Sequence, residues 1–395
     1  TTSFKGEDKS LPLRSGRQQS SHDFAVAQAR ANGGRFGRFL LTRGVDYHIV
    51  QMNGEAMEAA RDEGAVVNML QDETKAGMDS LMHRMNRNIF RNSGMAAAQI
   101  LSGAGTDTLT LTDYRDMLAL SEGNFIVPST DDGTGGAGVL GPATEIVRIN
   151  RQPGVATLQA AGVWDPGFAN GSFIFLEGDY GLGFFGAAAW FPENDPQPGD
   201  PQFFGVDRSR DPMRYAGQRF TALSSDGDLP SFFDRAFTDY GLQAGRGNLC
   251  IINPTMWRRL AQQLGSQVRY EKRLGQGTGG NTMMMKGPNN SSVEVGFTAI
   301  KLVGAYEDMY ICADRDCPFN DGYVFDTEYF WWEGLGEAPR YLGYDGMGGV
   351  GNRGAWLRIS NEDAIEGRMG ARGQFASNNP GSCARLNIPD AANLF

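Results

Sequence analysis

The longest regular pattern of apolar positions in the chain covers residues 53–92. Apolar or small side chains recur there in steps of three and four, which places them on one side of an α-helix. They are Met57, Ala60, Gly64, Val67, Leu70, Thr74, Met78, Leu81, Met85 and Ile89. The pattern predicts one helix over residues 54–92, capped by Asn53, with acidic first turns and basic last turns that suit the helix dipole. A helix of roughly 57 Å is expected to cross an extended subunit.

Two glycines, Gly64 and Gly77, lie inside this predicted helix. Glycine in a helix interior costs about 1 kcal/mol relative to alanine. We therefore expect the helix to bend, or a strand to approach closely, at both positions.

Two strand-like runs precede the helix, at residues 24–31 and 35–52. The turn Asn32-Gly33-Gly34 between them predicts a β-hairpin. Alternation in the second run predicts an apolar face made of Phe39, Leu41, Val45, Tyr47 and Ile49. The opposite face is expected to carry Arg38, Thr42, Asp46 and His48. Such an apolar face is covered either by another subunit or by the chain's own body.

Residues 1–20 are polar and have no sustained period, which predicts an N-terminal arm that is flexible unless it lies on another surface. Residues 1–50 carry eight Lys or Arg against four Asp or Glu, a net charge of +4. The whole chain carries −10, so the remainder carries −14. A basic arm on an acidic body favours association between copies or contact with a polyanion, although a solvated tail has the same composition.

Beyond the long helix, the pattern changes repeatedly between helix and strand, which predicts an α+β region. Helices are expected at residues 112–121, 228–241 and 253–265, each with a capping residue and a closing glycine. Strands are expected at residues 144–150, 172–176, 249–252, 293–297, 300–303, 309–313 and 323–332. Alternation over residues 363–375 predicts an unusually long strand, which we expect to lie along the long helix, and residues 383–388 a further one.

Composition is that of a globular protein, with 395 residues, 41% hydrophobic and 21% charged, enough for two or three domains. No apolar run reaches the roughly 18 residues that cross a bilayer, so no membrane contact is expected. The four cysteines are too scattered for a disulfide framework, and we expect a reduced setting during folding.

Candidate chemistry is sparse. Two segments match the G-x-G-x-x-G pattern of dinucleotide sites, at residues 133–138 and 181–186, but neither is followed by a helix of useful length. Cys312 and Cys317 lack a second pair at zinc spacing, and Pro318 occupies a ligand position in the loosely calcium-like run of Asp314, Asp316 and Asp321. We therefore expect no catalytic residue, cofactor or metal.

The order of elements resembles the major capsid proteins of tailed bacteriophages, which have the Hong Kong-97-type shell fold. Short stretches resemble that family as well: residues 46–48 with 54–61, residues 203–209, Ile251-Ile252-Asn253-Pro254 with Trp257 and Leu260, and Asp316-Cys317-Pro318. The resemblance spans residues 20 to 390.

The resemblance implies an α+β, Hong Kong-97-like fold in five parts. An N-terminal arm (1–20) and an extended β-hairpin loop (21–53) are followed by a peripheral domain (54–174) that contains the spine helix (54–92). An axial domain (175–332) comes next, and residues 333–395 return to the peripheral domain.

It also implies the function: a coat protein that self-assembles through hexamers and pentamers into an icosahedral shell around double-stranded DNA. The implied partners are further copies, portal, scaffolding and decoration proteins, and loosely held DNA. The implied location is the virion capsid, assembled in the host cytoplasm. The expected subunit-interface residues are Arg35, Phe36, Arg38, Phe39, Arg43, Asp46, Tyr47, Glu55, Glu58 and Arg61.

Some shells of this family are crosslinked through a lysine on the extended loop. Here no lysine lies between Lys9 and Lys75, so we expect a shell without covalent crosslinks, with intersubunit ion pairs made by Arg35, Arg38, Arg43 and Asp46. Two alternatives stay open: an encapsulin-type nanocompartment, which would hold protein cargo, and a nucleotide-binding enzyme that uses the glycine-rich loops.

Overall fold

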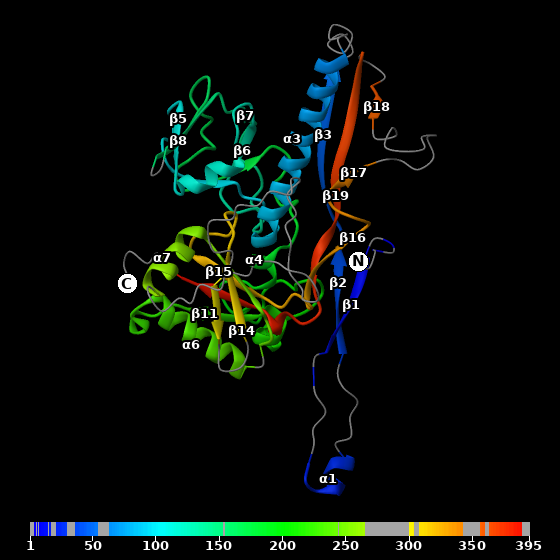
Figure 1. Cartoon of the computed structure of the whole chain (residues 1–395), viewed down its shortest axis with the longest axis vertical. Helices are drawn as coiled ribbons and strands as arrows, with labels where there is room; N and C mark the ends of the chain where they lie inside the picture. The colour runs from blue at the N-terminus through cyan, green and yellow to red at the C-terminus, as the bar shows by residue number, and fades with distance from the viewer. Residues whose placement is uncertain are drawn as a thin grey trace. The chain divides into compact units, whose positions relative to one another are not determined.

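The computed structural model describes residues 4, 6, 8–14, 16, 21–29, 36–53, 63–152, 155–243, 245–264, 300–303, 308–342, 356–359 and 363–388 (Figure 1). The chain divides into two compact units. Unit 1 comprises Thr1–Gly217 and Glu328–Pro380, and unit 2 comprises Gln218–Thr327 and Gly381–Phe395. Both contain helices and sheets, which confirms the predicted α+β class.

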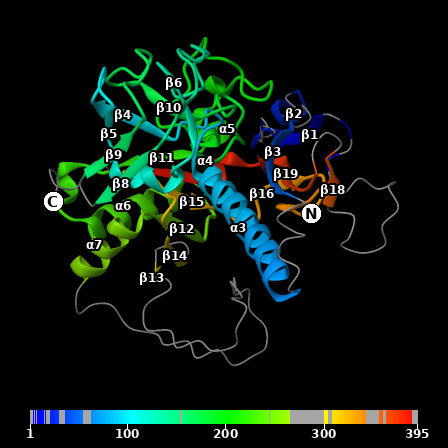
Figure 2. The ribbon, with the colours of Figure 1, turned by 90° about the horizontal axis from the view of Figure 1, so that it is seen from above.

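Unit 1 contains the long helix α3 (Glu63–Phe90), which lies alongside the strands β3 (Gly44–Asn53) and β19 (Ala364–Ser377) (Figures 1 and 2). The two strands pair antiparallel over the whole of β3. The 28-residue helix is about 42 Å long and the 14-residue strand about 46 Å. The prediction of a long strand beside a long helix is confirmed.

The helix contacts the strands through the predicted apolar stripe. Leu81 is buried with Val50 and Met369, and Met78 packs against them. Further along, Met85 and Ile89 pack against a second buried cluster, made of Phe184, Ala371 and Phe375. Burial of such side chains, each worth about 1.5–3 kcal/mol, is what holds α3 on the strands.

At Gly77, side chains of both strands lie close to the helix backbone. A Cβ built on Gly77 would lie 2.7 Å from Met369 Cε and 2.9 Å from the ring of His48. The expected close strand contact is therefore confirmed at Gly77, whereas the surroundings of Gly64 lie outside the described side chains.

Replacing Gly77 by leucine should lower the free energy of unfolding by about 2 kcal/mol, because overpacking of a tight site costs about 1–3 kcal/mol. Leucine is a better helix former than glycine, so a loss must come from crowding against β3 and β19. Ala76→Leu, on the exposed neighbouring position, is the control and should change little. Urea denaturation of both variants measures the difference; equal stabilities would contradict the close contact.

The described part of the long helix is α3, which begins at Glu63. Asn53, the residue predicted to cap the helix, is the last residue of β3 and pairs with Ala364. Residues 54–62 lie outside the described part of the chain, so the cap at Asn53 stays a prediction.

The predicted hairpin is wrong in its first strand. Residues Phe24–Ala29 form a short helix, α1, with the carboxylate of Asp23 accepting hydrogen bonds from the amides of Ala25 (2.8 Å) and Val26 (3.4 Å). The alanine-rich sequence after a capping aspartate favours a helix. The partner of β2 (Phe36–Thr42) is instead β1 (Asp8–Arg14), inside the segment predicted to be a flexible arm.

The long run after the hairpin divides at Arg43 into β2 and β3, and its inward face changes there. Phe39 and Leu41 are buried on β2, as predicted. On β3, however, Asp46, Val50 and Met52 are buried, whereas Val45, Tyr47 and Ile49 are exposed. A shift of one residue in the alternation exchanges the two faces of a strand.

A seven-stranded antiparallel sheet follows α3 in unit 1, in the order β7-β6-β10-β4-β5-β9-β8. Its strands are β4 (Ala98–Ser102), β5 (Thr108–Leu111), β6 (Phe125–Ser129), β7 (Thr144–Glu145), β8 (Arg148–Gln152), β9 (Val155–Gln159) and β10 (Phe173–Leu176). The short 3-10 helix η1 (Tyr114–Ala119), capped by Asp113, replaces the helix predicted at 112–121. The buried core beside the seven-stranded sheet includes Ile126, Leu158, Trp164 and Phe168.

The rest of unit 1 contains short elements. They are α4 (Ala187–Trp190), η2 (Arg208–Arg210), α5 (Pro212–Ala216), β16 (Phe330–Gly334), β17 (Arg340–Tyr341), β18 (Trp356–Arg358) and η6 (Pro380–Ser382), the last of which ends in unit 2. Strands β16, β17 and β18 all pair antiparallel with β19.

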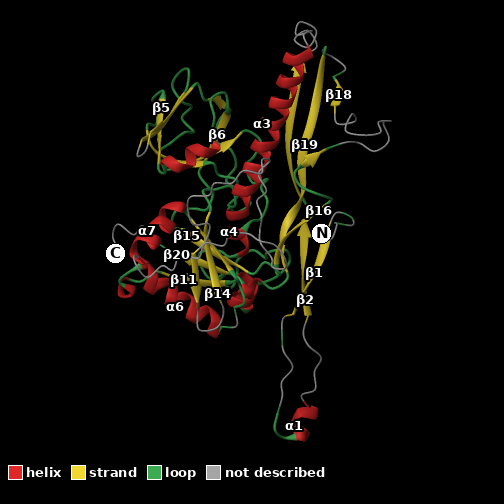
Figure 3. Ribbon diagram, in the orientation of Figure 1, coloured by secondary structure: helices red, strands yellow, loops and turns green. Residues whose placement is uncertain are grey.

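Unit 2 contains a mixed six-stranded sheet in the order β11-β20-β15-β12-β14-β13. Its strands are β11 (Gln218–Thr221), β12 (Leu249–Ile252), β13 (Ile300–Val303), β14 (Asp308–Ala313), β15 (Asp321–Phe325) and β20 (Ala384–Asn387). The helices α6 (Leu229–Leu242) and α7 (Pro254–Leu264) lie beside it (Figure 3), and η3 (Ser224–Asp226) precedes α6. Phe232, Phe233, Ile252 and Leu260 belong to the shared buried core.

The boundaries of the units differ from the predicted domains. Unit 2 begins at Gln218, whereas the axial domain was predicted to begin at residue 175. Unit 2 also includes residues 381–395, which were predicted to belong to the peripheral domain. The aromatic strand predicted over 323–332 is also divided: β15 belongs to unit 2 and β16 to unit 1, because the chain changes unit between Thr327 and Glu328. The strand predicted at 293–297 lies outside the described residues.

Candidate functional site

Of the ten residues predicted to form a subunit interface, three stay exposed on the outer sides of β2 and β3. Phe36 is 72% exposed and Tyr47 is 53% exposed, and Arg38 lies between Phe36 and Leu40 on the exposed side of β2. The guanidinium of Arg372 lies 5.6 Å from the centre of the Tyr47 ring. Arg35, Glu55, Glu58 and Arg61 lie outside the described residues.

Three other predicted interface residues have partners within the chain. Phe39 is fully buried, Asp46 is buried, and Arg43 donates a hydrogen bond to the carbonyl oxygen of Gly6 at 2.9 Å. Within the chain the Asp46 carboxylate pairs with Arg84 of α3, because it lies buried on the helix-facing side of β3. Its predicted ion pair with another subunit stays a prediction.

Phe39 fixes β2 to the body of unit 1. Its ring packs edge-on against Trp190 at 5.2 Å and Phe203 at 6.4 Å between centres. Next to it, Leu40 N donates to Phe204 O at 2.9 Å. The Arg208 guanidinium lies 4.0 Å from the centre of the Phe203 ring. The family-like stretch at residues 203–209 is thus a support for β2.

Arg84 of α3 pairs with two carboxylates from other elements of unit 1. Its Nε donates to Asp46 Oδ2 at 2.8 Å, and its Nη2 donates to Asp179 Oδ1 at 2.6 Å. Asp46 comes from β3, Arg84 from α3, and Asp179 from the turn after β10. One half-buried cation therefore joins the helix, the long strand pair and the end of the seven-stranded sheet.

Arg84, Asp46 and Asp179 form a triad in which one guanidinium group pairs with two carboxylates. Burial raises the pKa of Asp46, against the attraction of Arg84, and the Asp179 charge raises it further. The two carboxylates together raise the pKa of Arg84 in spite of burial. The cation is thus held firmly, while the carboxylate of Asp46 is costly to keep charged.

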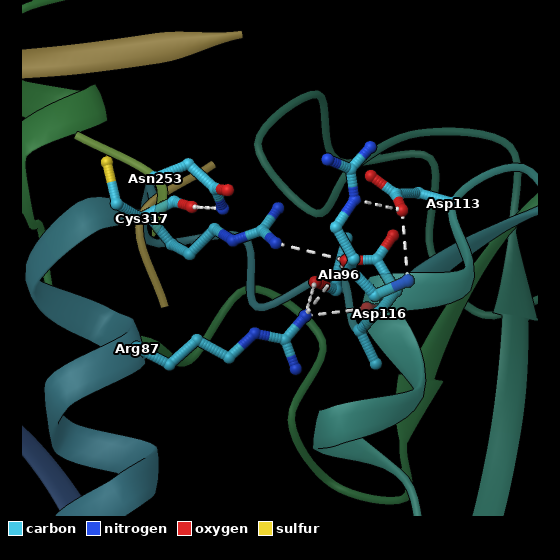
Figure 4. A network of polar contacts seen from close by, with 9 residues as sticks. Arg87, Ala96, Asp113, Asp116, Asn253 and Cys317 are labelled. Carbon is cyan, nitrogen blue, oxygen red and sulfur yellow. Dashed lines mark hydrogen bonds and ion pairs between the residues drawn. The ribbon is translucent and has the colours of Figure 1, made fainter. Parts of the chain in front are cut away.

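Two further arginines of the same helix face contact η1 and the segment before β4; Figure 4 shows Arg87 with Ala96 and Asp116. Arg87 Nη2 donates to the carbonyl oxygen of Ala97 at 2.6 Å and lies 3.8 Å from Asp116 Oδ1. Arg91 Nη2 donates to the same Asp116 oxygen at 3.1 Å. Burial raises the pKa of Asp116, in spite of both arginines.

Sequence reasoning missed this network. Arg84, Arg87 and Arg91 are spaced by three and four, which places them on one helix face next to the apolar stripe. The helix dipole alone also favours basic residues at this end of a helix. Their spacing was a signal for partners, but nothing in the sequence identified Asp46, Asp179 and Asp116 as those partners, since they lie 25 to 95 residues away.

The N-terminal strand is also anchored. Lys9 of β1 pairs with Glu333 of β16, a fully buried carboxylate that also accepts a hydrogen bond from Trp331 Nε1 at 2.9 Å. Phe4 is buried, and its amide donates to Gly334 O at 3.3 Å. A buried carboxylate needs a charge partner, so Lys9 holds the start of the chain on unit 1.

Neither glycine-rich motif has the geometry of a nucleotide site. In the first, the amides of Gly133 and Ala137 donate to the carboxylate of Asp131 at 3.0 and 2.8 Å. Tyr180 Oη donates to the same carboxylate at 2.7 Å. These hydrogen bonds hold the pKa of Asp131 below its usual range. The amides of Gly133 and Ala137 are therefore already bonded to a carboxylate of the chain itself.

The second motif is a packing contact. Gly181 N and Gly183 N donate to the carbonyl oxygens of Gly94 and Ser93 at 3.1 and 2.9 Å. Gly186 begins the four-residue helix α4 directly against the carboxyl end of α3. A helix of this length offers no pyrophosphate site of the dinucleotide type.

Among the described residues, no three His, Cys, Asp or Glu side chains converge in a way that would hold a metal ion. The four cysteines are free thiols, and burial raises the pKa of Cys383 to about 12. No described helix combines the length and the apolar character needed to cross a bilayer.

Two of the family-like stretches contact each other in unit 2. The side-chain amide of Asn253 donates to Cys317 O at 2.9 Å (Figure 4), and its oxygen accepts from Thr255 N at 3.0 Å. Asn253 therefore caps α7 and fixes the turn after β14 at the same time.

No family model matches the sequence, and no curated protein matches it either. Solved structures do match. A chain of the cyanophage A-1(L) capsid asymmetric unit is 11% identical, with a TM-score of 0.51, and the match covers 98% of this chain and 89% of that one. A chain of the native GTA particle capsid (8% identity, TM-score 0.44, 98% and 86% covered) and one of Mycobacterium phage Bobi (10%, 0.41, 98% and 87%) are less similar.

The cyanophage match bears on the fold, because it extends over nearly the whole of both chains and so includes both units. The chain therefore has the fold of a bacteriophage capsid protein.

Proposed function

We propose that the chain is the major capsid protein of a tailed bacteriophage, which self-assembles through hexamers and pentamers into an icosahedral shell around double-stranded DNA. The observation that carries the proposal is the match to a capsid subunit over 98% of this chain. In this proposal the protein is structural and not an enzyme. The filled glycine-rich loop at Asp131 and the close-packed one at Gly186 speak against the nucleotide-binding alternative.

The proposed roles follow the parts of the fold. α3 is the spine helix and unit 1 contains the peripheral domain, whereas unit 2 is the axial domain. The β1–β2 ribbon with α1 is the extended loop that reaches a neighbouring subunit.

Exposed apolar side chains support a role in association. Val45, Tyr47 and Ile49 form a stripe on the side of β3 that faces away from α3, and each is about half exposed. Contiguous exposed apolar surface on a sheet marks an interaction site. Further copies of the chain are the partners that a shell requires.

The proposed shell has no covalent crosslinks. Lys9 is the last lysine before Lys75, and its ammonium group is paired with the buried carboxylate of Glu333. The net charge of −10 fits loose containment of DNA, because a strongly basic lining would bind DNA tightly through counterion release. Portal, scaffolding and decoration proteins, and assembly in the host cytoplasm, complete the proposal.

Negative-stain electron microscopy of the purified full chain tests the proposal, with closed shells as the expected result. Nuclease-protected DNA inside particles from infected cells would separate a virion from an encapsulin-type compartment, which would contain protein cargo. A chain that stays a monomer at all concentrations would overturn the proposal.

Crosslinking has its own test. Boiling the particles in detergent should release monomers of 42.9 kDa. A ladder of covalent multimers would show that the shell is crosslinked.

A further inference from the structure

Three exposed side chains form a row across one end of the seven-stranded sheet: Glu177, Phe125 and Glu145. Phe125 of β6 pairs with Glu145 of β7, and on its other side Phe125 O accepts a hydrogen bond from Glu177 N at 2.9 Å. Directly opposed residues of antiparallel strands point to the same side of the sheet. The Phe125 ring, 48% exposed, therefore lies between two exposed carboxylates.

This combination suits a guanidinium group. An aromatic face attracts a cation, and a carboxylate on each side adds charge-assisted hydrogen bonds. Within the described part of the chain, neither Glu145 nor Glu177 has an ion-pair partner. Val147, exposed two residues beyond Glu145, adds apolar surface next to the row.

The outer side of β2 has the complementary character. Phe36, Arg38 and Leu40 alternate on the exposed side of the strand, so one cation lies between two apolar side chains. Arg38 makes no ion pair with a described residue. Both surfaces are exposed in the single chain, so neither covers the other within it.

We propose that the outer side of β2 in one copy docks on the Glu177–Phe125–Glu145 row of a second copy. Arg38 then lies against Phe125 between the two carboxylates, and Phe36 and Leu40 flank it on apolar surface that includes Val147. Two different surfaces of the same chain make this a head-to-tail contact, the type that closes into rings. The inference rests on the proposed function. It identifies the surface of the neighbouring copy on which the β1–β2 ribbon docks.

A charge exchange tests the contact. Arg38→Glu should lower the yield of closed particles at least about tenfold, because it places three carboxylates together in a desolvated interface. Glu145→Arg should do the same by placing two guanidinium groups together. The double variant Arg38→Glu with Glu145→Arg should recover particles. Arg210→Glu, at an arginine that is 79% exposed, is the control and should assemble like the wild type.

The outcomes separate the two proposals. A wild type that forms no shells overturns the proposed function. A wild type that forms shells, together with an undiminished Arg38→Glu variant or a double variant that stays unassembled, overturns only this contact. Circular dichroism confirms that each variant is folded, and Glu145→Gln with Glu177→Gln, which keeps the shapes of the side chains, should also reduce assembly.

Discussion

Replacing Arg84 by methionine is expected to lower the free energy of unfolding by about 3 kcal/mol. Removing one partner of a buried ion pair leaves an uncompensated charge and costs about 3–5 kcal/mol. Here Arg84 serves both Asp46 and Asp179, whose side chains are 5% and 11% exposed. The Arg84 side chain itself is 32% exposed, so water screens part of the loss and the lower end of the range applies.

Two further variants separate the contributions. Arg84→Lys keeps the charge but loses the planar fork that reaches both carboxylates, so it should lie between wild type and Arg84→Met. Asp46→Asn should cost less than Arg84→Met, because Asp179 still pairs with Arg84 and a carboxylate that burial disfavours is gone. Denaturation of the unassembled chain in urea measures all three. A loss below about 1 kcal/mol for Arg84→Met, the value of surface pairs, would contradict a buried triad.

The pH dependence of the Arg84→Met loss has a definite sign. The pKa of Asp46 is already above its ordinary value of 3.8, and removal of the cation raises it further. A carboxyl whose pKa is raised by folding favours the folded state most at low pH, and this contribution is lost as the pH rises through the folded-state value. The stability gap between wild type and Arg84→Met should therefore be widest at neutral pH and narrow toward the acid side. A gap independent of pH would mean that Asp46 stays charged without Arg84.

The sequence was informative where a local pattern and the long-range contacts agree. The steps of three and four that include Leu81 and Met85 mark the helix face that packs on β3 and β19. The alternation over residues 363–375 predicted β19, and the Asp228 and Asn253 caps predicted the starts of α6 and α7. These signals depend on residues that are close in sequence, so the sequence alone is enough to detect them.

Partner choice could not be predicted in the same way. The strand that pairs with β2 comes from residues 8–14, in a segment whose polar composition suggested a free arm. Its anchors, Lys9 on Glu333 and buried Phe4, join positions more than 300 residues apart. The inversion of faces at Arg43 is of the same kind, because α3 decides which side of β3 is buried.

The residues of the predicted interface have different surroundings within the single chain. Phe36, Arg38 and Tyr47 are exposed, whereas Phe39 and Asp46 support the subunit itself. A hydrophobic or charged residue on a strand has the same pattern in sequence whether a neighbouring subunit or its own helix covers it. The tertiary contacts distinguish the two cases: α3 covers Asp46, and Trp190 and Phe203 cover Phe39.

Replacing Gly186 by alanine is expected to have the largest effect, a loss of about 4 kcal/mol or failure to fold. The backbone of Gly186, with φ −82° and ψ −161°, is open to any residue, so strain in the dihedral angles is not the reason. The loss comes from a steric clash between the added Cβ and the carbonyl oxygens at the carboxyl end of α3. A Cβ on Gly186 would lie 2.0 Å from Asn88 O and 2.7 Å from Ile89 O, and backbone atoms in a helix cannot move aside as a flexible side chain can.

A displacement of α4 by this clash would also disturb the aromatic contacts that support β2. Gly186 starts α4, which carries buried Trp190, and Trp190 donates to Phe375 O at 3.1 Å and packs against Phe39. Gly162→Ala is the matched control, since no heavy atom lies within 4 Å of the added Cβ; it should stay within about 0.5 kcal/mol of the wild type or gain slightly. Soluble yield and urea denaturation measure both. If Gly186→Ala unfolds like Gly162→Ala, the backbone of α4 does not meet the end of α3, and the aromatic support of the ribbon would need another anchor.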